Sequence, residues 1–435
     1  MIHPVRYLSR ILTVGLLTVL SCAPEDMVSV PADAAFALPA GVTPLSSAIR
    51  RALEGVYQVT DNAKPFGEFI VLRWSYVASG ADTTHYLSMF AGREVSYFIL
   101  QGGRQDSTVH FSGYWRKMTS FQTGNAAFTI NASEGGRALT GPTPRAQRDT
   151  LSITGRFDTG GGTTVQSMTL RYVRPLYATT PFAMMAHRGG GRNSDMLPAS
   201  ENTVAMILMA ERFGATGVEI DVRMTTDNVP IIFHDENLNL RLNIKNGLVG
   251  PVESYSYVQL QTFVRLLHDE QIPTLREMLD AVVDRTNLRF VWLDMKSARP
   301  SMAAVRALQR AAMLRANAQA VAGRRNPLVI LIGIPDEDKA AEFLSLPDHA
   351  DAPAICEVSP DEVRRTGAAV WAPRWTLGTQ PTEVAQMHAE GRKVVVWTLD
   401  VPQYIAQFVQ EGDLDGILSN YPSSVAFTYF VKPPQ

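Results

Sequence analysis

Two different periods of apolar residues divide the chain. From residue 46 to about 175, a short helical stretch (46–53) is followed by runs in which apolar and polar residues alternate. These runs are rich in aromatic and β-branched residues and are separated by Gly, Asp, Asn and Ser, a pattern typical of antiparallel strands. The eight runs cover 55–60, 68–76, 85–90, 95–101, 108–115, 126–131, 151–156 and 167–173. They predict a small all-β domain over residues 46–175, either a barrel or a sandwich.

After an expected linker at 174–181, apolar strand cores alternate with amphipathic helical segments. The strand candidates are 183–187, 217–222, 230–234, 290–296, 328–333, 354–358, 369–374, 394–398 and 416–419. The helical candidates include 203–213, 275–285, 302–315, 336–344 and 383–390. This alternation over about 250 residues predicts a TIM (β/α)8 barrel over 182–432. Because there are nine candidates for eight staves, we expect 230–234 to be a hairpin excursion. The fold class is therefore α/β, a TIM barrel preceded by a small antiparallel all-β domain.

The N-terminus has the pattern of an export signal. Arg6 and Arg10 precede an apolar run at 11–20 that is too short to span a bilayer. The run ends in Ser21-Cys22, which resembles the bacterial lipoprotein signal, and an ordinary secretory signal is the alternative. We expect a signal peptide at 1–21, lipidation of Cys22, and a flexible tether at 22–45. Cys22 is followed directly by Ala23 and not by an aspartate, which by the same resemblance favours an outer-membrane lipoprotein of a bacterial envelope, facing the periplasm or the exterior.

Composition narrows the classes of function. The 435 residues are 46% hydrophobic and 19% charged, which is ordinary for a globular protein. A net charge of −2 gives no basic field for binding nucleic acid. The two cysteines are Cys22 and Cys356, so lipidation of the first leaves no intramolecular disulfide. Cys356 lies in an apolar run and is expected to be a small buried hydrophobe. The sequence does not indicate an oligomeric state.

Carboxylates lie at the end of one predicted barrel strand. Glu219 and Asp221 are two residues apart, so both side chains point to the same face. Two like charges inside a barrel are costly unless something compensates them. A divalent cation does so, and hard oxygen ligands suit Ca²⁺ or Mg²⁺. The alternative is a structural salt bridge to an arginine.

Two histidines end separate predicted strands, where a barrel delivers side chains to its active-site mouth. These are His187 and His234, and Arg188 follows the first of them. A histidine pair can take up one proton and give another near neutral pH. Arg188 offers a planar fork to phosphate oxygens. Together with the carboxylates, this set is typical of a hydrolase.

These residues belong to blocks that resemble one family. The blocks are His187-Arg188-Gly189, Glu201-Asn202-Thr203, residues 218–235, residues 395–399 and residues 415–422. Their order and placement at strand ends resemble the glycerophosphodiester phosphodiesterase family over roughly 183–430. The resemblance implies that His187 and His234 are the general acid and general base, with Arg188 as a catalytic and phosphate-binding residue.

The resemblance also implies further site residues. A third carboxylate ligand is expected from the block Asp294-Met295-Lys296, where the family usually carries glutamate. Lys296 is expected to face a phosphate oxygen, or else to be a counter-ion for the acidic cluster. Glu201 is either an additional metal ligand or a residue that orients Arg188, and we favour the second role.

Two further features bear on the pocket. Trp397 is expected to line the substrate pocket, with core packing as the alternative. The glycine-rich segment 189–195 lacks the spacing of a nucleotide-binding turn. We therefore expect it to be a mobile loop over the site.

The resemblance implies a phosphodiesterase that uses one divalent cation, Ca²⁺ or Mg²⁺. Its partners are a small glycerophosphodiester or lipid-headgroup substrate and, through the lipid anchor, a membrane. It would release an alcohol and glycerol 3-phosphate, with either a neighbouring substrate hydroxyl or water as nucleophile. One alternative is a phospholipase similar to sphingomyelinase D, although the disulfide-held loop of those enzymes is impossible with one remaining cysteine. The other is a non-catalytic binding lipoprotein of the envelope.

Overall fold

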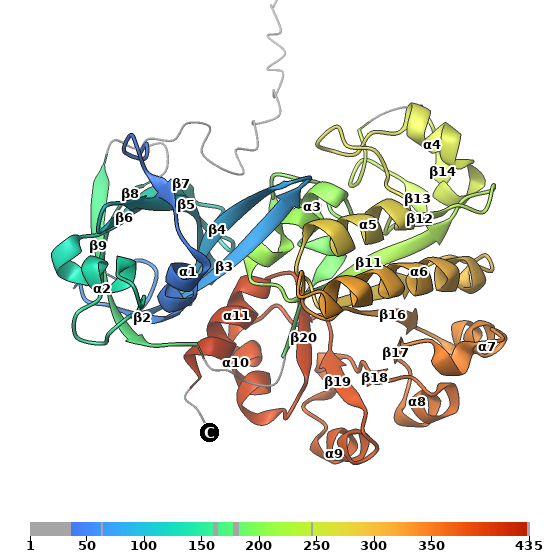
Figure 1. Cartoon of the computed structure of the whole chain (residues 1–435). Helices are drawn as coiled ribbons and strands as arrows, with labels where there is room; N and C mark the ends of the chain where they lie inside the picture. Colours follow the sequence, from blue (N-terminus) through green and yellow to red (C-terminus); the bar gives the residue numbers. More distant parts are fainter. Residues whose placement is uncertain (1–35, 62–63, 160–163, 177–181, 245–246, 433–435) are drawn as a thin grey trace, which may run out of the picture.

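The computed structural model describes residues 36–61, 64–159, 164–176, 182–244 and 247–432. Two barrels lie side by side, the first in blue to green and the second in green to red (Figure 1). The expected signal at 1–21 and the lipidation site Cys22 lie outside the described residues, so they stay predictions. No helix within these ranges is both long and apolar enough to cross a bilayer.

The first barrel is closed and antiparallel. Each strand pairs with the next along the chain, and the last pairs with the first through Tyr57 and Tyr172. The strands are β2 (Gly55–Val59), β3 (Phe69–Ser79), β4 (Asp82–Ala91), β5 (Ser96–Gln105), β6 (Thr108–Lys117), β7 (Thr123–Ile130), β8 (Ser152–Asp158) and β9 (Val165–Arg174). All eight expected strands are present, and of the two expected architectures the barrel is the one that forms. The helices are α1 (Ser47–Leu53) and α2 (Gly136–Thr140).

Aromatic side chains occupy the interior of this first barrel. Phe66 contacts Phe98, Trp115 and Phe157 edge to face, with ring centroids 4.7, 5.3 and 5.1 Å away. All four rings are at most 3% exposed. Such edge-to-face pairs add to the stabilisation that burial alone gives. The interior around these rings is therefore a packed core.

The end of the expected tether is part of this barrel. The short strand β1 (Thr43–Pro44) pairs with β5, and Leu45 and Phe36 are buried. The guanidinium of Arg156 lies 4.8 Å from the Phe36 ring. Residues 36–45 thus differ from the flexible tether expected up to residue 45, because their apolar side chains have a surface to pack on.

The second barrel is parallel and closed, as predicted. Its staves are β10 (Ala183–Ala186), β11 (Gly217–Met224), β15 (Phe290–Met295), β16 (Val329–Ile334), β17 (Ala354–Cys356), β18 (Val370–Trp371), β19 (Lys393–Val396) and β20 (Gly416–Ser419). The first stave pairs with both β11 and β20, which closes the circle. The strand β12 (Pro230–Ile232) runs antiparallel to β11, so the expected hairpin excursion is confirmed. The same excursion carries β13 (Asn237–Leu238) and β14 (Gly250–Pro251), which pair with each other.

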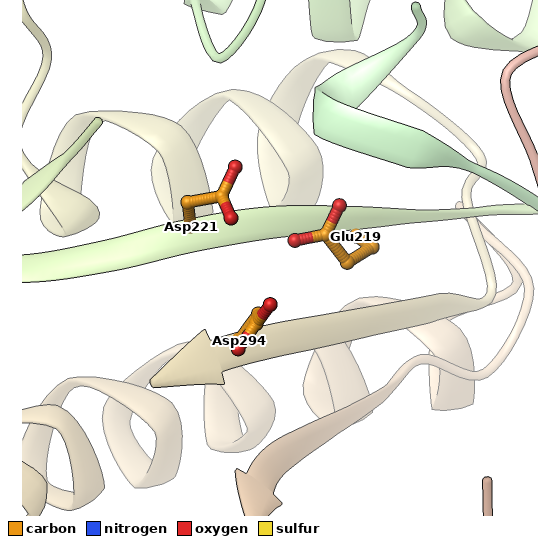
Figure 2. Close-up of side chains that lie close together, drawn as sticks. All are labelled: Glu219, Asp221 and Asp294. Atoms are coloured by element: carbon orange, nitrogen blue, oxygen red, sulfur yellow. The ribbon is translucent and has the colours of Figure 1, made fainter. Parts of the chain in front are cut away.

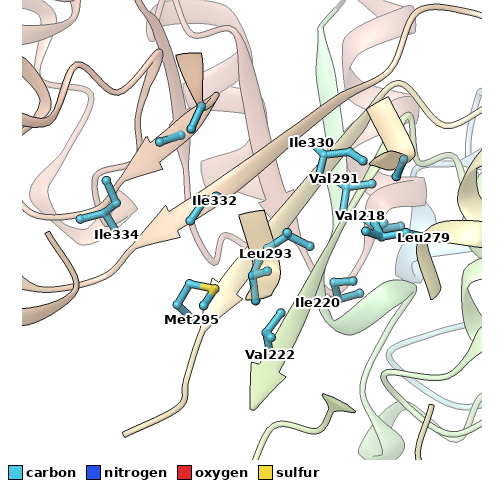
Figure 3. Packing of buried hydrophobic residues seen from close by; sticks show 14 of the residues in the cluster. Val218, Ile220, Val222, Leu279, Val291, Leu293, Met295, Ile330, Ile332 and Ile334 are labelled. Carbon is cyan, nitrogen blue, oxygen red and sulfur yellow. The ribbon is translucent and has the colours of Figure 1, made fainter. Parts of the chain in front are cut away.

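Helices cover the outside of this parallel barrel (Figure 1). They are α3 (Val204–Ala210), α5 (Leu275–Arg285), α6 (Met302–Val321), α7 (Glu337–Leu344), α8 (Pro360–Thr366), α9 (Pro381–Ala389), α10 (Pro402–Glu411) and α11 (Pro422–Val431). The helix α4 (Tyr257–Phe263) belongs instead to the excursion, where its Leu260 packs with Leu238 of β13. Alternate strand residues such as Val218, Ile220 and Leu293 pack toward the helices (Figure 3). The residues between them, Glu219 and Trp292 among them, point into the barrel.

The two barrels share an apolar seam. Val71, Phe90 and Tyr97 of the first barrel belong to one buried cluster with Phe213 and Val425 of the second. Polar contacts reinforce the seam. Arg73 Nη1 donates to the Gly214 carbonyl over 3.1 Å, and Arg174 Nη2 donates to the Phe430 carbonyl over 2.7 Å. The first barrel is thus packed directly against the second.

Candidate active site

Three carboxylates meet inside the mouth of the parallel barrel. Glu219 and Asp221 lie on β11, and Asp294 lies opposite Asp221 on the neighbouring strand β15. Each offers an oxygen within 4.8 Å of the others. Figure 2 shows the three side chains converging from the two strands. Glu219 and Asp221 lie on the same face of β11 because they are two residues apart, and the pairing of β11 with β15 brings Asp294 beside them.

The carboxylate cluster fits a hard cation. One oxygen each of Glu219, Asp221 and Asp294 is buried with no hydrogen-bond partner among the described residues. Burial, and then the charges of Asp221 and Asp294, raise the pKa of Glu219 well above its usual range. Burial is also the main cause that raises the pKa of Asp294. Three converging buried oxygens without donors are the ligand type that Ca²⁺ and Mg²⁺ prefer.

Lys296 lies against this cluster. Its Nζ is 2.6 Å from Asp294 Oδ2 and 3.8 Å from Asp221 Oδ1. Burial alone would lower the pKa of Lys296, but these two carboxylates outweigh burial and raise it. The contacts correspond to the counter-ion alternative, and the phosphate-binding role of Lys296 stays a prediction.

Cation binding is expected to stabilise the protein more at about pH 8 than at about pH 5. The folded, cation-free protein keeps a proton on Glu219 that the unfolded chain gives up near 4.5. Its stability therefore falls as the pH rises from that value toward the raised pKa, and a bound cation offsets this loss. Thermal unfolding with chelator and with added Ca²⁺ across this pH range measures the difference in Tm. A cation-induced Tm shift that is independent of pH would contradict this linkage.

His187 is fixed through one ring nitrogen. It follows β10, and its Nδ1 is 2.7 Å from Asn420 Oδ1. The amide of Asn420 is itself oriented by Asp400, because Asn420 Nδ2 donates to Asp400 Oδ2 over 2.5 Å. Nδ1 of His187 is therefore the donor, and Nε2, 3.8 Å from Glu219 Oε2, is directed at the carboxylates. Burial first, and then Arg188, lower the pKa of His187 to about 4.

His234 has the corresponding arrangement on the other side. Its Nδ1 is 2.6 Å from Asp235 Oδ1, and its Nε2 is 2.9 Å from Arg188 Nη2. Burial acts to raise the pKa of Asp235, but hydrogen bonds from Arg241, His234 and Asn239 outweigh it and lower that pKa below its usual range. An ionised Asp235 accepts the Nδ1 proton and leaves Nε2 of His234 directed at Arg188.

Arg188 contacts both the carboxylate cluster, through Glu219, and His234. Its backbone N–H donates to Glu219 Oε2 over 2.8 Å, and its Nη1 donates to Glu201 Oε1 over 2.9 Å. Arg188 has a φ of +53°, a left-handed conformation that is uncommon outside glycine. The Asn202 N–H, 2.9 Å from the Arg188 carbonyl, helps to hold this turn. Glu201 thus contacts Arg188 and is not among the three converging carboxylates. These contacts correspond to the orienting alternative, which stays a prediction.

Trp397 both lines the barrel and packs in its core. Its indole contacts Trp292 edge to face at 6.5 Å, and its Nε1 donates to the Ala372 carbonyl over 2.7 Å. The guanidinium of Arg374 lies 5.1 Å from the ring. These contacts correspond to the core-packing alternative, and the role of Trp397 in lining the substrate pocket stays a prediction.

Several residues that support the site were not predicted from the sequence. Asp400 and Asn420 hold His187, and Arg241 bridges Asp235 and Glu201 with contacts of 2.6 and 3.0 Å.

Glu357 follows β17 two residues after Ile355, which points into the barrel. Burial, and then Asp294, raise the pKa of Glu357 to about 8. A carboxylate two residues beyond an inward-facing strand position was the available signal for Glu357.

Two other expectations concern residues near the site. Cys356 is buried in the layer between strands and helices, as predicted, and burial raises the pKa of its thiol to about 11.

Segment 189–195 differs from the mobile loop expected from its glycines. Its Arg192 and Asp195 side chains pair at 2.8 Å, and Asn193 and Glu201 exchange two hydrogen bonds.

Comparisons with known proteins relate most of the second barrel to one family. The model of the Glycerophosphoryl diester phosphodiesterase family matches residues 187–424, which is more than half of the chain. The chain is 38% identical over 97 residues to Glycerophosphodiester phosphodiesterase 1 of Rattus norvegicus, covering 21% of this chain and 28% of that protein. The match therefore spans less than a third of the rat protein.

A longer match covers 245 residues of Probable glycerophosphodiester phosphodiesterase 2 of Mycobacterium tuberculosis. It is 28% identical and covers 54% of this chain and 86% of that protein. Two solved structures each have a TM-score of 0.44 and 21% identity, covering 56% of this chain and 95% of the other. One is a glycerophosphodiester phosphodiesterase from Parabacteroides distasonis, and the other is an Oleispira antarctica phosphodiesterase in complex with sn-glycerol-3-phosphate.

Proposed function

This chain belongs to the glycerophosphoryl diester phosphodiesterase family, and on that premise we propose that it hydrolyses glycerophosphodiesters with the help of one divalent cation. The products are an alcohol and glycerol 3-phosphate. The observation that carries the proposal is the convergence of three buried carboxylates between two histidines. Each histidine has its Nδ1 fixed and its Nε2 directed into the same mouth.

Glu219, Asp221 and Asp294 are the residues that would hold the cation. A bound Ca²⁺ or Mg²⁺ would withdraw charge from the phosphoryl oxygens as a Lewis acid. Asp294 is one methylene shorter than the glutamate usual in the family, and it nevertheless converges with the other two within 4.8 Å. Arg188 contributes fixed positive charge beside the same carboxylates, with its Nη2 on the side of His234.

The two histidines divide the proton transfers. We assign to His234 the proton transfer to the leaving alkoxide, because its Nδ1 is held by Asp235 and its Nε2 faces the mouth beside Arg188. His187 is then the base that takes the proton from the nucleophile, with Nδ1 held by Asn420 and Nε2 free to accept. This assignment holds whether the nucleophile is a substrate hydroxyl or water.

Export belongs to the same proposal. The lipoprotein-type signal and Cys22 would place the enzyme in a bacterial envelope, at a membrane surface.

The substrate class is tested by incubating the purified protein with glycerophosphocholine and, separately, with vesicles of phosphatidylcholine or sphingomyelin. We expect release of choline and glycerol 3-phosphate from glycerophosphocholine and no cleavage of the intact lipids. Cleavage of sphingomyelin alone would replace the proposal by the phospholipase alternative. Binding of glycerophosphocholine with no turnover of any diester would replace it by the non-catalytic alternative.

A further inference from the structure

The N-terminal barrel reaches a loop of the proposed active site. The loop runs from residue 190 to residue 197, between His187-Arg188 and the block that begins at Glu201. Arg116, at the end of β6, is 1% exposed and points at this loop. Its Nη2 donates to the carbonyl of Asp195 over 2.6 Å, in a buried contact between the two barrels.

The contacted residue is the end of a locked turn. The Asp195 carboxylate accepts from the Arg192 backbone N–H over 2.9 Å, from Nε over 3.2 Å and from Nη2 over 2.8 Å. Arg192 also lies over the ring of Tyr421, 5.9 Å from its centroid. Arg192 and Asp195 are therefore tied together within the turn, and Arg116 binds one end of it.

The other face of the same turn holds the phosphate-binding arginine. The Asn193 N–H donates to Glu201 Oε2 over 2.9 Å, and the Glu201 N–H donates to Asn193 Oδ1 over 2.8 Å. The second oxygen, Glu201 Oε1, accepts from Arg188 Nη1. A continuous set of contacts thus runs from the first barrel to Arg188, whose other Nη meets His234.

Apolar packing supports the same loop. Leu197 is 2% exposed and lies in one cluster with Tyr97 and Met118 of the first barrel. Gly191 approaches Leu197 so closely that a Cβ there would lie 2.5 Å from Leu197 Cδ1. The loop is therefore held by the first barrel through both a buried hydrogen bond and packed side chains.

We infer that the N-terminal β-barrel is a positioning element for catalysis, in which Arg116 holds the loop 190–197 so that Glu201 keeps Arg188 in place beside His234. Arg116 touches no reacting atom and acts through the loop, so it is a positioning residue. The catalytic part of this inference rests on the proposed function. The structural part, a loop fixed by the first barrel, stands independently of the substrate.

Arg116→Met keeps a long apolar stem and removes every donor. We expect kcat to fall by about tenfold with little change in KM, since a misplaced Arg188 weakens interactions with transition-state charge more than ground-state binding. Amide hydrogen exchange in peptides covering 190–197 is expected to rise by on the order of tenfold, while α5 peptides keep their wild-type rates. Arg116→Lys, which can still donate to the Asp195 carbonyl, is expected to recover most of both losses.

Arg156→Met is the control, because Arg156 lies on β8 of the same barrel and its guanidinium lies over Phe36 instead of donating to the loop. It should leave loop exchange and kcat unchanged.

Wild-type exchange of 190–197 in folded Arg116→Met would overturn the inference, and so would a loosened loop with wild-type kcat. Should Arg116→Met fail to fold, Met118→Ala removes packing from Leu197, and wild-type loop exchange in that variant would equally overturn it. If the wild-type enzyme hydrolyses no diester, the proposed function is wrong. The hydrogen-exchange experiment still tests the loop contact in that case, because it needs no substrate.

Discussion

Replacing His234 by alanine is expected to lower kcat for glycerophosphocholine by on the order of 10²–10⁴-fold, the usual contribution of a general acid or base. His234 is the residue whose Nε2 faces Arg188 and whose Nδ1 is held by Asp235 at 2.6 Å. His187→Ala should cost a similar factor. Steady-state rates on protein of unchanged Tm measure both effects.

The leaving group separates the two histidines. A diester with a p-nitrophenyl leaving group needs no proton donor, so His234→Ala should lose much less activity on it than on glycerophosphocholine, whereas His187→Ala should lose the same on both. His268→Ala is the control, because the His268 side chain is exposed and the hydrogen bonds of this residue go to Ser200 and Glu270, not to the three carboxylates. Equal losses on both substrates for His234→Ala would contradict its assignment as the acid.

Glu219→Gln is expected to lower turnover by about 10³-fold, because a cation site that loses one charged ligand loses several kcal/mol of transition-state stabilisation. The variant should fold, since burial and the charges of Asp221 and Asp294 already disfavour an ionised Glu219 without a cation. Its cation-free Tm is therefore expected to equal or exceed that of the wild type, and added Ca²⁺ should no longer raise it.

Asp284→Asn is the matched control, as Asp284 is a half-exposed carboxylate on α5 that pairs with Arg315. It should keep both the activity and the Ca²⁺-induced rise in Tm. A Glu219→Gln enzyme with wild-type turnover would exclude Glu219 as a ligand that the reaction needs.

The parts of the fold with a regular period were predictable from sequence. The period of two that places Glu219 and Asp221 on one face also separates them from Val218 and Ile220, which pack against the helices. The excursion at Pro230–Ile232 was predictable because nine apolar runs cannot all be staves of an eight-stranded barrel. Closure of the first barrel was not predictable from sequence, because it depends on the pairing of Tyr57 with Tyr172, which are far apart in the chain.

The residues that support the site carry no such period. Asp400, Asn420 and Arg241 come from loops, and their roles arise from which side chains the folded strands bring within hydrogen-bonding distance. The segment 189–195 has the glycines of a mobile loop, and the pairing of Arg192 with Asp195 is visible only in three dimensions. Arg116 lies in the other barrel, so no local pattern connects it with the site.

In the proposed mechanism, turnover requires one divalent cation on Glu219, Asp221 and Asp294. This requirement is tested most directly by stripping the wild-type enzyme with chelator and adding back Ca²⁺ or Mg²⁺ while binding and glycerophosphocholine hydrolysis are followed together. We expect negligible activity after stripping, and recovery in parallel with the binding of about one equivalent of cation per chain. Full activity of the stripped enzyme, or cation binding that leaves the rate unchanged, would contradict it.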